Sequence, residues 1–249
     1  MTAERTTRRT DALTRQLIVA TAIAILDAEG EDALTFRTLA NRLATGAGAI
    51  YWHIANKDEL LSSAAGTIIA EAVGSVLAHP DSATDQTKEI SPAIDPAITP
   101  VTPVTNAGTH DPRAQVRAIA LALYDAFDAH PWVGSQLARE PWREGSVQIL
   151  EAIGSQLQPL GVPAASQFDA ASALTTYISG AASQNAAHAR SVPTNLDRAA
   201  YLAQAAQRWT RLDPADYPFV HRVLAGLADH DDRQQFLAGI DFILTGITA

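Results

Sequence analysis

The chain has 249 residues, no cysteine and a formal net charge of −9 at pH 7. Without cysteine, neither disulfides nor thiolate metal sites can form, which fits a cytoplasmic protein. The acidic balance argues against a protein that coats nucleic acid through its overall charge. We see no apolar run of the about 20 residues that a membrane helix needs, and the first residues do not resemble a signal peptide.

A basic segment, residues 1–15, precedes the first expected helix. It contains Arg5, Arg8, Arg9 and Arg15, and the only acid within residues 5–15 is Asp11. Such an arm is either a tail without a role or a segment that lies along phosphates or in a DNA groove. The residues alone leave both interpretations open.

Apolar residues within 16–29 recur at helical spacing, and Gly30 is placed to end that helix. A second, short helix is expected over residues 35–43, with Thr35 as its N-cap. After a break at residues 44–46, a third short helix is expected to run from Gly48 to Ile54.

Asn56 is expected to cap a longer fourth helix that extends to about Leu77. Glu59 falls at the N3 position, where its carboxylate can reach back to the start of the helix in a capping box. The following segment, at about 79–111, is rich in Pro, Thr, Ser and Asp. Because proline removes backbone donors and interrupts helices, this composition predicts a disordered insertion.

Helical patterns resume beyond that insertion, and no strand-like alternation of useful length is found. The expected helices cover residues 112–129, a short broken one after 130, then 142–158, 164–189, 195–211, 216–229 and 233–247. The sequence therefore predicts an all-α fold. It consists of an N-terminal three-helix head, residues 16–62, and a larger helical body, residues 63–249.

The second and third helices of the head have the layout of a helix-turn-helix. In that motif the second helix enters the major groove of DNA. Ile50 and Ile54 lie four residues apart and are expected to face the core of the head. Tyr51 and Trp52 then project elsewhere, where a hydroxyl or an indole N–H can reach a phosphate. A pair of helices with a tight break is also often purely structural.

The segment "LTFRTLANRLATGAGAIYWHIANKDELL" resembles the DNA-binding signature of the TetR/AcrR family of transcriptional regulators. The "YWH" followed by "NK" and "LL" is especially similar to the tetracycline repressor subfamily. The resemblance covers roughly residues 16–62, and the C-terminal "FLAGIDFILTGI" is similar to the closing helix of that subfamily. It implies a ligand-responsive regulator, most simply a repressor, that binds a palindromic operator as a homodimer.

The resemblance also implies roles for individual residues of the head. Thr35 matches a phosphate contact, and Arg37 matches a position that can reach a base, to which arginine is well suited. The base-facing start of the recognition helix is matched by three small residues, Ala47, Gly48 and Ala49. Positions that contact phosphates or support the helix are matched by Tyr51, Trp52, His53 and Lys57. His53 by itself is more simply a packing or capping residue.

Two departures from the family pattern affect the head. The turn carries Ala44 where glycine is usual, and a left-handed alanine costs about 1 kcal/mol. Gly46 is the alternative carrier of the positive φ, which leaves the turn geometry open. The small residues at 47–49 offer only methyl contacts or close approach, so Arg37 and the basic arm must supply most of the sequence preference.

The resemblance implies that the body dimerises through helices at about 164–189 and 233–247 and binds a small-molecule effector. The apolar stripe of the last helix also fits an ordinary core helix. Effector-binding candidates are the aromatic and polar residues of helices 112–190, namely Tyr124, Phe127, Trp132, Trp142, Tyr177, Gln184, Asn185 and His188. Gln184, Asn185 and His188 could instead serve the dimer interface.

Tetracycline repressors use a histidine late in the fourth helix, where this chain has Val73. An aromatic or hydrophobic effector is therefore expected in place of a magnesium–tetracycline chelate. The resemblance further implies that the effector makes the fourth helix swing, so that the two heads no longer match the operator.

Two other classes of protein compete with a regulator. One is a helical enzyme, and the other is a protein-interaction module that uses the helix-turn-helix structurally. The seven histidines show no metal-ligand spacing, and the chain contains no GxSxG, GxGxxG or P-loop motif. We therefore expect no enzymatic activity, no metal and no cofactor.

Overall fold

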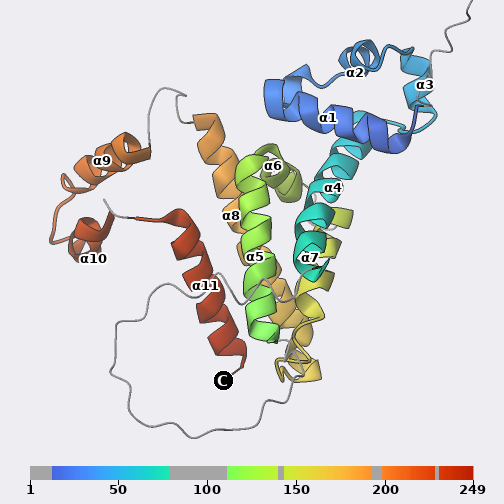
Figure 1. Ribbon diagram of the computed structural model, residues 1–249. Coiled ribbons are helices and arrows are strands. Elements are labelled where there is room, and N and C mark those ends of the chain that lie inside the picture. Colours follow the sequence, from blue (N-terminus) through green and yellow to red (C-terminus); the bar gives the residue numbers. More distant parts are fainter. Residues whose placement is uncertain (1–12, 79–110, 140–142, 192–197, 228–229, 249) are drawn as a thin grey trace, which may run out of the picture.

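The computed structural model describes residues 13–78, 111–139, 143–191, 198–227 and 230–248. Most of the expected basic arm, most of the insertion and Trp142 lie outside these ranges. The head consists of three helices and a short 3₁₀ helix, and a long helix leads from it into the body (Figure 1). These elements are α1 (Arg15–Glu29), η1 (Glu31–Ala33), α2 (Phe36–Arg42), α3 (Ala47–Tyr51) and α4 (Lys57–Ala78).

The body contains the remaining helices, and the described residues include no strand. They are α5 (Pro112–Ala129), α6 (Trp132–Arg139), α7 (Glu144–Gly154), α8 (Ala164–Ser191), α9 (Arg198–Trp209), α10 (Pro218–Val223), the 3₁₀ helix η3 (Leu224–Leu227) and α11 (Asp232–Ile247). The all-α prediction is confirmed, with helix boundaries within a few residues of those expected. In Figure 1, α9 and α10 lie to one side of the other body helices.

Local capping signals explain where α1 begins and ends. The Thr14 hydroxyl accepts a hydrogen bond from the Leu17 N–H and so caps the helix start. Gly30 ends the helix with φ at 79°, and its N–H donates to the Leu26 carbonyl. Arg15, which the sequence analysis assigned to the basic arm, is the first residue of α1.

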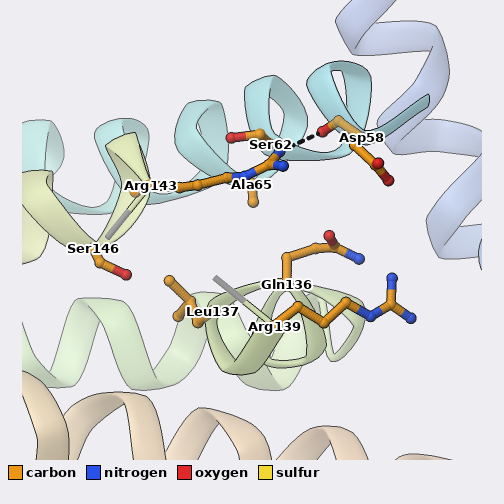
Figure 2. A pocket seen from close by; sticks show the side chains of 9 residues that line it. Asp58, Ser62, Ala65, Gln136, Leu137, Arg139, Arg143 and Ser146 are labelled. Atoms are coloured by element: carbon orange, nitrogen blue, oxygen red, sulfur yellow. Dashed lines mark hydrogen bonds between the residues drawn. The ribbon is translucent and has the colours of Figure 1, made fainter. Parts of the chain in front are cut away.

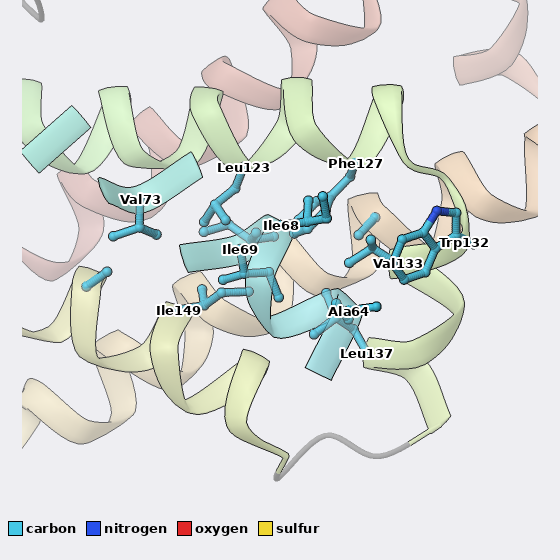
Figure 3. Packing of buried hydrophobic residues seen from close by; sticks show 14 of the residues in the cluster. Ala64, Ile68, Ile69, Val73, Leu123, Phe127, Trp132, Val133, Leu137 and Ile149 are labelled. Carbon is cyan, nitrogen blue, oxygen red and sulfur yellow. The ribbon is translucent and has the colours of Figure 1, made fainter. Parts of the chain in front are cut away.

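Helix α4 belongs to both parts of the molecule, because it contacts α1 of the head as well as α5 and α7 of the body. The expected boundary at residue 62 therefore falls inside one continuous helix. By length and composition alone α4 could cross a membrane, with a mean hydropathy of 1.6 over 18 residues. It is a more apolar run than the sequence analysis recognised. Here, one part of the helix surface is buried in the core of the body and head (Figure 3), namely Leu60, Leu61, Ala64, Ala65, Gly66, Ile68, Ile69 and Val73.

Helix α6 packs closely on α8 because Gly134 has no side chain. A Cβ atom at Gly134 would lie 2.0 Å from the Ala182 carbonyl oxygen, well inside contact distance. The two backbones can approach this closely only with glycine at the crossing. This contact fixes α6 between the head and α8.

The apolar stripe predicted on the last helix serves mainly the protomer's own core. Ile240 and Leu244 are fully buried, and α11 contacts α5 and α8. Leu237, Ile243 and Ile247 are half-buried. By contrast, Phe242 on α11 is 78% exposed.

Candidate DNA-binding head and effector cavity

The two helices of the predicted helix-turn-helix are joined by a turn that depends on Ala44. Thr35 caps α2, since its hydroxyl accepts from the Thr38 N–H at 3.0 Å. Ala44 adopts φ of 49°, whereas Gly46 has φ of −83°. The suggestion that Gly46 carries the positive φ is therefore wrong. The turn keeps its left-handed residue at position 44 and accepts the steric cost of a Cβ atom there.

The start of α4 is capped in a modified capping box. The Asn56 side-chain oxygen accepts from the Glu59 N–H at 2.8 Å, as predicted. The Glu59 carboxylate reaches back one residue further than expected, to the Ala55 N–H at 2.8 Å, and pairs with Arg15 at 2.9 Å. The Ala55 hydrogen bond, followed by the Arg15 contact, lowers the pKa of Glu59.

Arg15 ties the first helix to the end of the recognition segment. Its guanidinium also donates to the His53 carbonyl at 2.9 Å and to the Ser63 hydroxyl at 2.8 Å. Ile50 and Ile54 are fully buried, as predicted for the core of the head. The recognition helix is thus held by apolar packing on one side and by an arginine at its C-terminal end.

The predicted DNA-contacting residues lie on α2, on α3 and in the turn before α4. Arg37, Ala47 and Gly48 are exposed, and Ala49 is half-buried. Among the described residues, the Arg37 guanidinium makes no hydrogen bond or ion pair. Trp52 is 89% exposed. This surface can present an arginine, an indole and bare backbone to a ligand.

Tyr51 and Lys57 already have side-chain partners within the head. The Tyr51 ring stacks on Phe36 with centroids 4.4 Å apart, and more than half of Tyr51 stays exposed. His53 is half-buried. The Lys57 ammonium donates to the Glu31 carbonyl at 2.8 Å, so it holds η1 against the start of α4.

A polar junction connects the head to α6. Asp27 accepts from the Trp132 indole N–H at 2.7 Å and lies 2.7 Å from His130 Nδ1. Glu31 accepts from Gln136 at 3.2 Å and from Arg139 at 2.7 Å. These side chains fix the orientation of the head on the body.

A further contact joins α7 to the start of α4. The Arg143 guanidinium donates to the Asp58 carbonyl at 2.9 Å (Figure 2). The Glu31 contact raises the pKa of Arg139, which keeps that guanidinium charged at any working pH. Two arginines of the body therefore hold acceptors of the head.

The structure brings together only some of the predicted effector-binding residues. Tyr124 and Tyr177 both pack on Phe236 of α11, at centroid distances of 4.9 and 5.4 Å. Burial is the main cause of the raised pKa of both phenols. Asn185 is half-buried, and its interaction with the Tyr124 hydroxyl opposes the rise in the pKa of Tyr124.

The other predicted effector-binding residues are dispersed. Phe127 is buried in the main core, and Trp132 belongs to the junction with the head. Gln184 and His188 are exposed on α8. The eight predicted residues thus do not line one common cavity, and their role stays a prediction.

An apolar cavity lies between α6, α7 and α8 and has a volume of about 360 Å³. Its lining combines aliphatic and small side chains with a row of hydroxyls along α8: Leu137, Ala138, Ser146, Val147, Leu150, Ser172, Thr175, Thr176, Ser179, Gly180 and Ser183. The Thr175 hydroxyl is buried without a hydrogen-bond partner. The size is within the range of small-molecule sites, and the unpaired hydroxyl offers a polar anchor.

A wider groove of about 710 Å³ lies where the head meets α6 and α8. Its lining includes the acidic residues Asp27, Glu31 and Asp32. Because these carboxylates face the groove, it suits an apolar effector less well than the cavity between α6, α7 and α8.

A helix-turn-helix with an exposed reading face, joined by one continuous helix to a body with a small-molecule cavity, defines a ligand-responsive DNA-binding regulator. Comparison with known proteins identifies the family. The model described as bacterial regulatory proteins of the tetR family matches residues 18–64, and the tetracyclin repressor-like C-terminal domain matches residues 102–249. The chain belongs to the TetR family of transcriptional regulators, which bind operator DNA and effectors, typically as dimers, and are not enzymes.

Individual relatives agree with this assignment. A TetR transcriptional regulator of Streptomyces coelicolor is 42% identical, with a TM-score of 0.74 over 95% of this chain and 98% of that chain. An HTH-type transcriptional regulator of Saccharopolyspora erythraea is 26% identical over 99% of this chain and 89% of its own length. ActR of Streptomyces coelicolor in complex with actinorhodin shares the fold, with 23% identity, a TM-score of 0.66 and coverage of 95% and 96%.

The sequence analysis did not find the junction residues Asp27, Glu31, Arg139 and Arg143. Each is an ordinary charged residue in or next to a helix, and its partners are far away in the chain. Only the folded arrangement of α1, η1, α4, α6 and α7 brings them together.

Proposed function

We propose that the protein is a homodimeric repressor that binds a palindromic operator and leaves it when a small molecule occupies the body. The observation that carries this proposal is the path from the cavity to the reading face. Helix α6 lines the cavity and bonds to Asp27 and Glu31 of the head. A change at the cavity can therefore reorient the head without any other intermediary.

At the operator, Arg37 is proposed to read a base edge and the small residues 47–49 to allow close approach of α3 to the major groove. Thr35, Tyr51, Trp52, His53 and Lys57 are proposed to contact or support contacts with phosphates. The exposed indole of Trp52 and the unused guanidinium of Arg37 support these roles. The bond between Lys57 and Glu31 implies that Lys57 exchanges this partner when it meets a phosphate.

The dimer interface is proposed to form from the outer faces of α8 and α11. Phe168 on α8 is 63% exposed and Phe242 on α11 is 78% exposed. Because exposed phenyl rings on neighbouring helices form an apolar surface, their burial against a second copy of the chain is favourable. The inner stripe of α11 is already used by the protomer, so Phe242 is the better marker of the interface.

The effector is proposed to bind between α6, α7 and α8. The aromatic cluster of Tyr124, Tyr177 and Phe236 is packed ring against ring and therefore fits a core better than a binding site. The complex of ActR with actinorhodin supports a small-molecule site in a body of this fold. The aliphatic lining favours a hydrophobic or aromatic molecule, and the setting is proposed to be the cytoplasm.

Fluorescence anisotropy with DNA that flanks the protein's own gene tests this function. We expect salt-sensitive binding of one dimer to a fragment with an inverted repeat, at a protomer concentration that keeps the dimer intact. The Phe242→Asp variant should shift the protein towards monomer and lose operator binding. If no flanking fragment binds more tightly than random DNA, the protein does not repress its own gene region.

A further inference from the structure

We propose that the effector is an amphiphilic organic anion whose acidic group binds between Arg139 and Arg143 while its apolar part fills the cavity along α8. This inference rests on the proposed function and specifies its ligand. It also assigns a means of release: the acidic group takes the two arginines away from the head.

A second, smaller cavity of about 80 Å³ supports this assignment (Figure 2). It is lined by Arg139 and Arg143, with Ser146 between them and the larger cavity. The volume is that of a few water molecules, which is enough for a carboxylate and too small for a ring system. Asp58 also faces this space, so an anion needs both arginines to bind there.

Ser146 offers a further hydrogen-bond donor to an anion in this space. It is only 7% exposed, and its hydroxyl makes no hydrogen bond with any described residue. Figure 2 shows the hydroxyl directed into the space between α7 and α6. Nor does a side chain cap the N-terminus of α7, the helix that Arg143 precedes. An anion would satisfy the hydroxyl and would also be favoured by the helix terminus.

The two cavities adjoin each other, because Leu137 and Ser146 line both. The proposed molecule extends past these two side chains, from the arginines into the aliphatic space next to α8. The apolar part supplies binding free energy through burial, and the acidic group supplies orientation. A purely apolar molecule would leave the Ser146 hydroxyl unpaired.

Both arginines are already engaged with the head, which links binding to regulation. Arg139 pairs with the Glu31 carboxylate at 2.7 Å, and Arg143 donates to the Asp58 carbonyl at 2.9 Å. A ligand carboxylate can accept two parallel hydrogen bonds from a guanidinium and so compete with Glu31. Glu31 then keeps only its hydrogen bond from Gln136, so the hold of α6 on η1 is weakened. The ligand thus favours the conformation in which the head is released.

The test uses two probes of nearly equal shape, 2-naphthylacetic acid and its neutral amide, titrated calorimetrically at pH 7.5. We expect the acid to bind the wild-type protein at least tenfold more tightly than the amide. Arg139→Gln and Arg143→Gln should each reduce the affinity for the acid about tenfold and leave the amide unchanged. Arg233→Gln is the matched control, because Arg233 pairs with Asp125 and lines neither cavity.

A further variant tests whether the ligand carboxylate replaces Glu31 as the partner of Arg139 or is only attracted by the charge of the arginine. Glu31→Gln removes the competing carboxylate, so the acid should bind several-fold more tightly than to wild type. Arg139→Lys should keep part of the preference, since it retains the charge without the paired donors. Equal binding of acid and amide, binding of neither, or an unchanged affinity in both arginine variants would overturn the proposal.

Operator binding without any probe separates this inference from the proposed function. If the wild-type protein binds operator DNA and the acid does not displace it, the regulator stands and the anion site is refuted. Loss of DNA binding in the presence of the acid, but not of the amide, supports both the site and the release. Absence of operator binding under all conditions refutes the repressor, whereas the calorimetric comparison still decides the site.

Discussion

The head and the body encode their functional surfaces in different ways. In the head, the residues from Thr35 to Lys57 form one contiguous segment, and capping, turn and core positions follow each other in the sequence. In the body, the cavity collects residues from three helices between Leu137 and Ser183. A local surface is readable from a motif, whereas a surface assembled by long-range packing is not.

The largest expected effect concerns the packing that builds the body. In Gly134→Ala the new methyl group would overlap the Ala182 carbonyl, so α6 must move away from α8. We expect a loss of about 3 kcal/mol in the free energy of unfolding, which corresponds to a melting temperature lower by about 6–12 °C. Differential scanning calorimetry at fixed protomer concentration measures this.

Gly74→Ala is the matched control, because a Cβ atom at this exposed position of α4 meets nothing within 4 Å. It should stabilise the protein by up to about 1 kcal/mol, since alanine favours a helix over glycine. Similar melting temperatures for the two variants would show that the α6–α8 crossing is not as tight as described.

The next effect tests the reading face of the head. Arg37→Ala should lower operator affinity by about 1–3 kcal/mol and relax the preference at one base pair per half-site. Lys57→Ala should weaken binding to all sequences evenly and reduce the salt dependence, because its proposed partner is a phosphate. Anisotropy titrations on a set of operators with single base changes distinguish the two, and identical profiles would contradict the assigned roles.

Features of the head were predictable from the sequence where they depend on near neighbours in the chain. The caps at Thr35 and Asn56 and the buried pair Ile50 and Ile54 were predictable, because each depends on neighbours within four residues. All expected helices of the described body were also found, since helical periodicity is local.

The cavity that we propose for the effector was not predictable by the same means. Aromatic residues such as Tyr124 and Phe127 were predicted to bind the effector, and in the structure they pack against other side chains. The cavity is lined by small and hydroxyl side chains, which carry no distinctive pattern in a sequence rich in alanine, serine and threonine. The link between Glu31 and Arg139 spans 108 positions, so no local spacing reveals it.

A smaller expected effect concerns the turn of the head, where Ala44 and not Gly46 has the positive φ. Ala44 has a positive φ, so Ala44→Gly should remove steric strain and stabilise the protein by about 1 kcal/mol. The same substitution at Ala20, an exposed position in the middle of α1, should cost about 1 kcal/mol. Chemical denaturation measures both, and equal signs would contradict a left-handed residue at position 44.

The smallest effect concerns the pH dependence of the head. The Ala55 N–H and Arg15 both favour the charged form of Glu59, so its pKa is lowered in the folded protein from the ordinary 4.5. A lowered pKa contributes stability that is complete above the unfolded value and is lost as pH falls through the folded value. Glu59→Gln should therefore flatten the fall in stability below about pH 4.5, with little change near neutrality beyond the lost ion pair.

Urea denaturation of both proteins between pH 3 and pH 7 measures the slope, and parallel curves would show that Glu59 is not held by the capping contacts. Because Arg15 and Glu59 join the first and fourth helices across 44 positions, this result would also show how far the head relies on contacts beyond its motif.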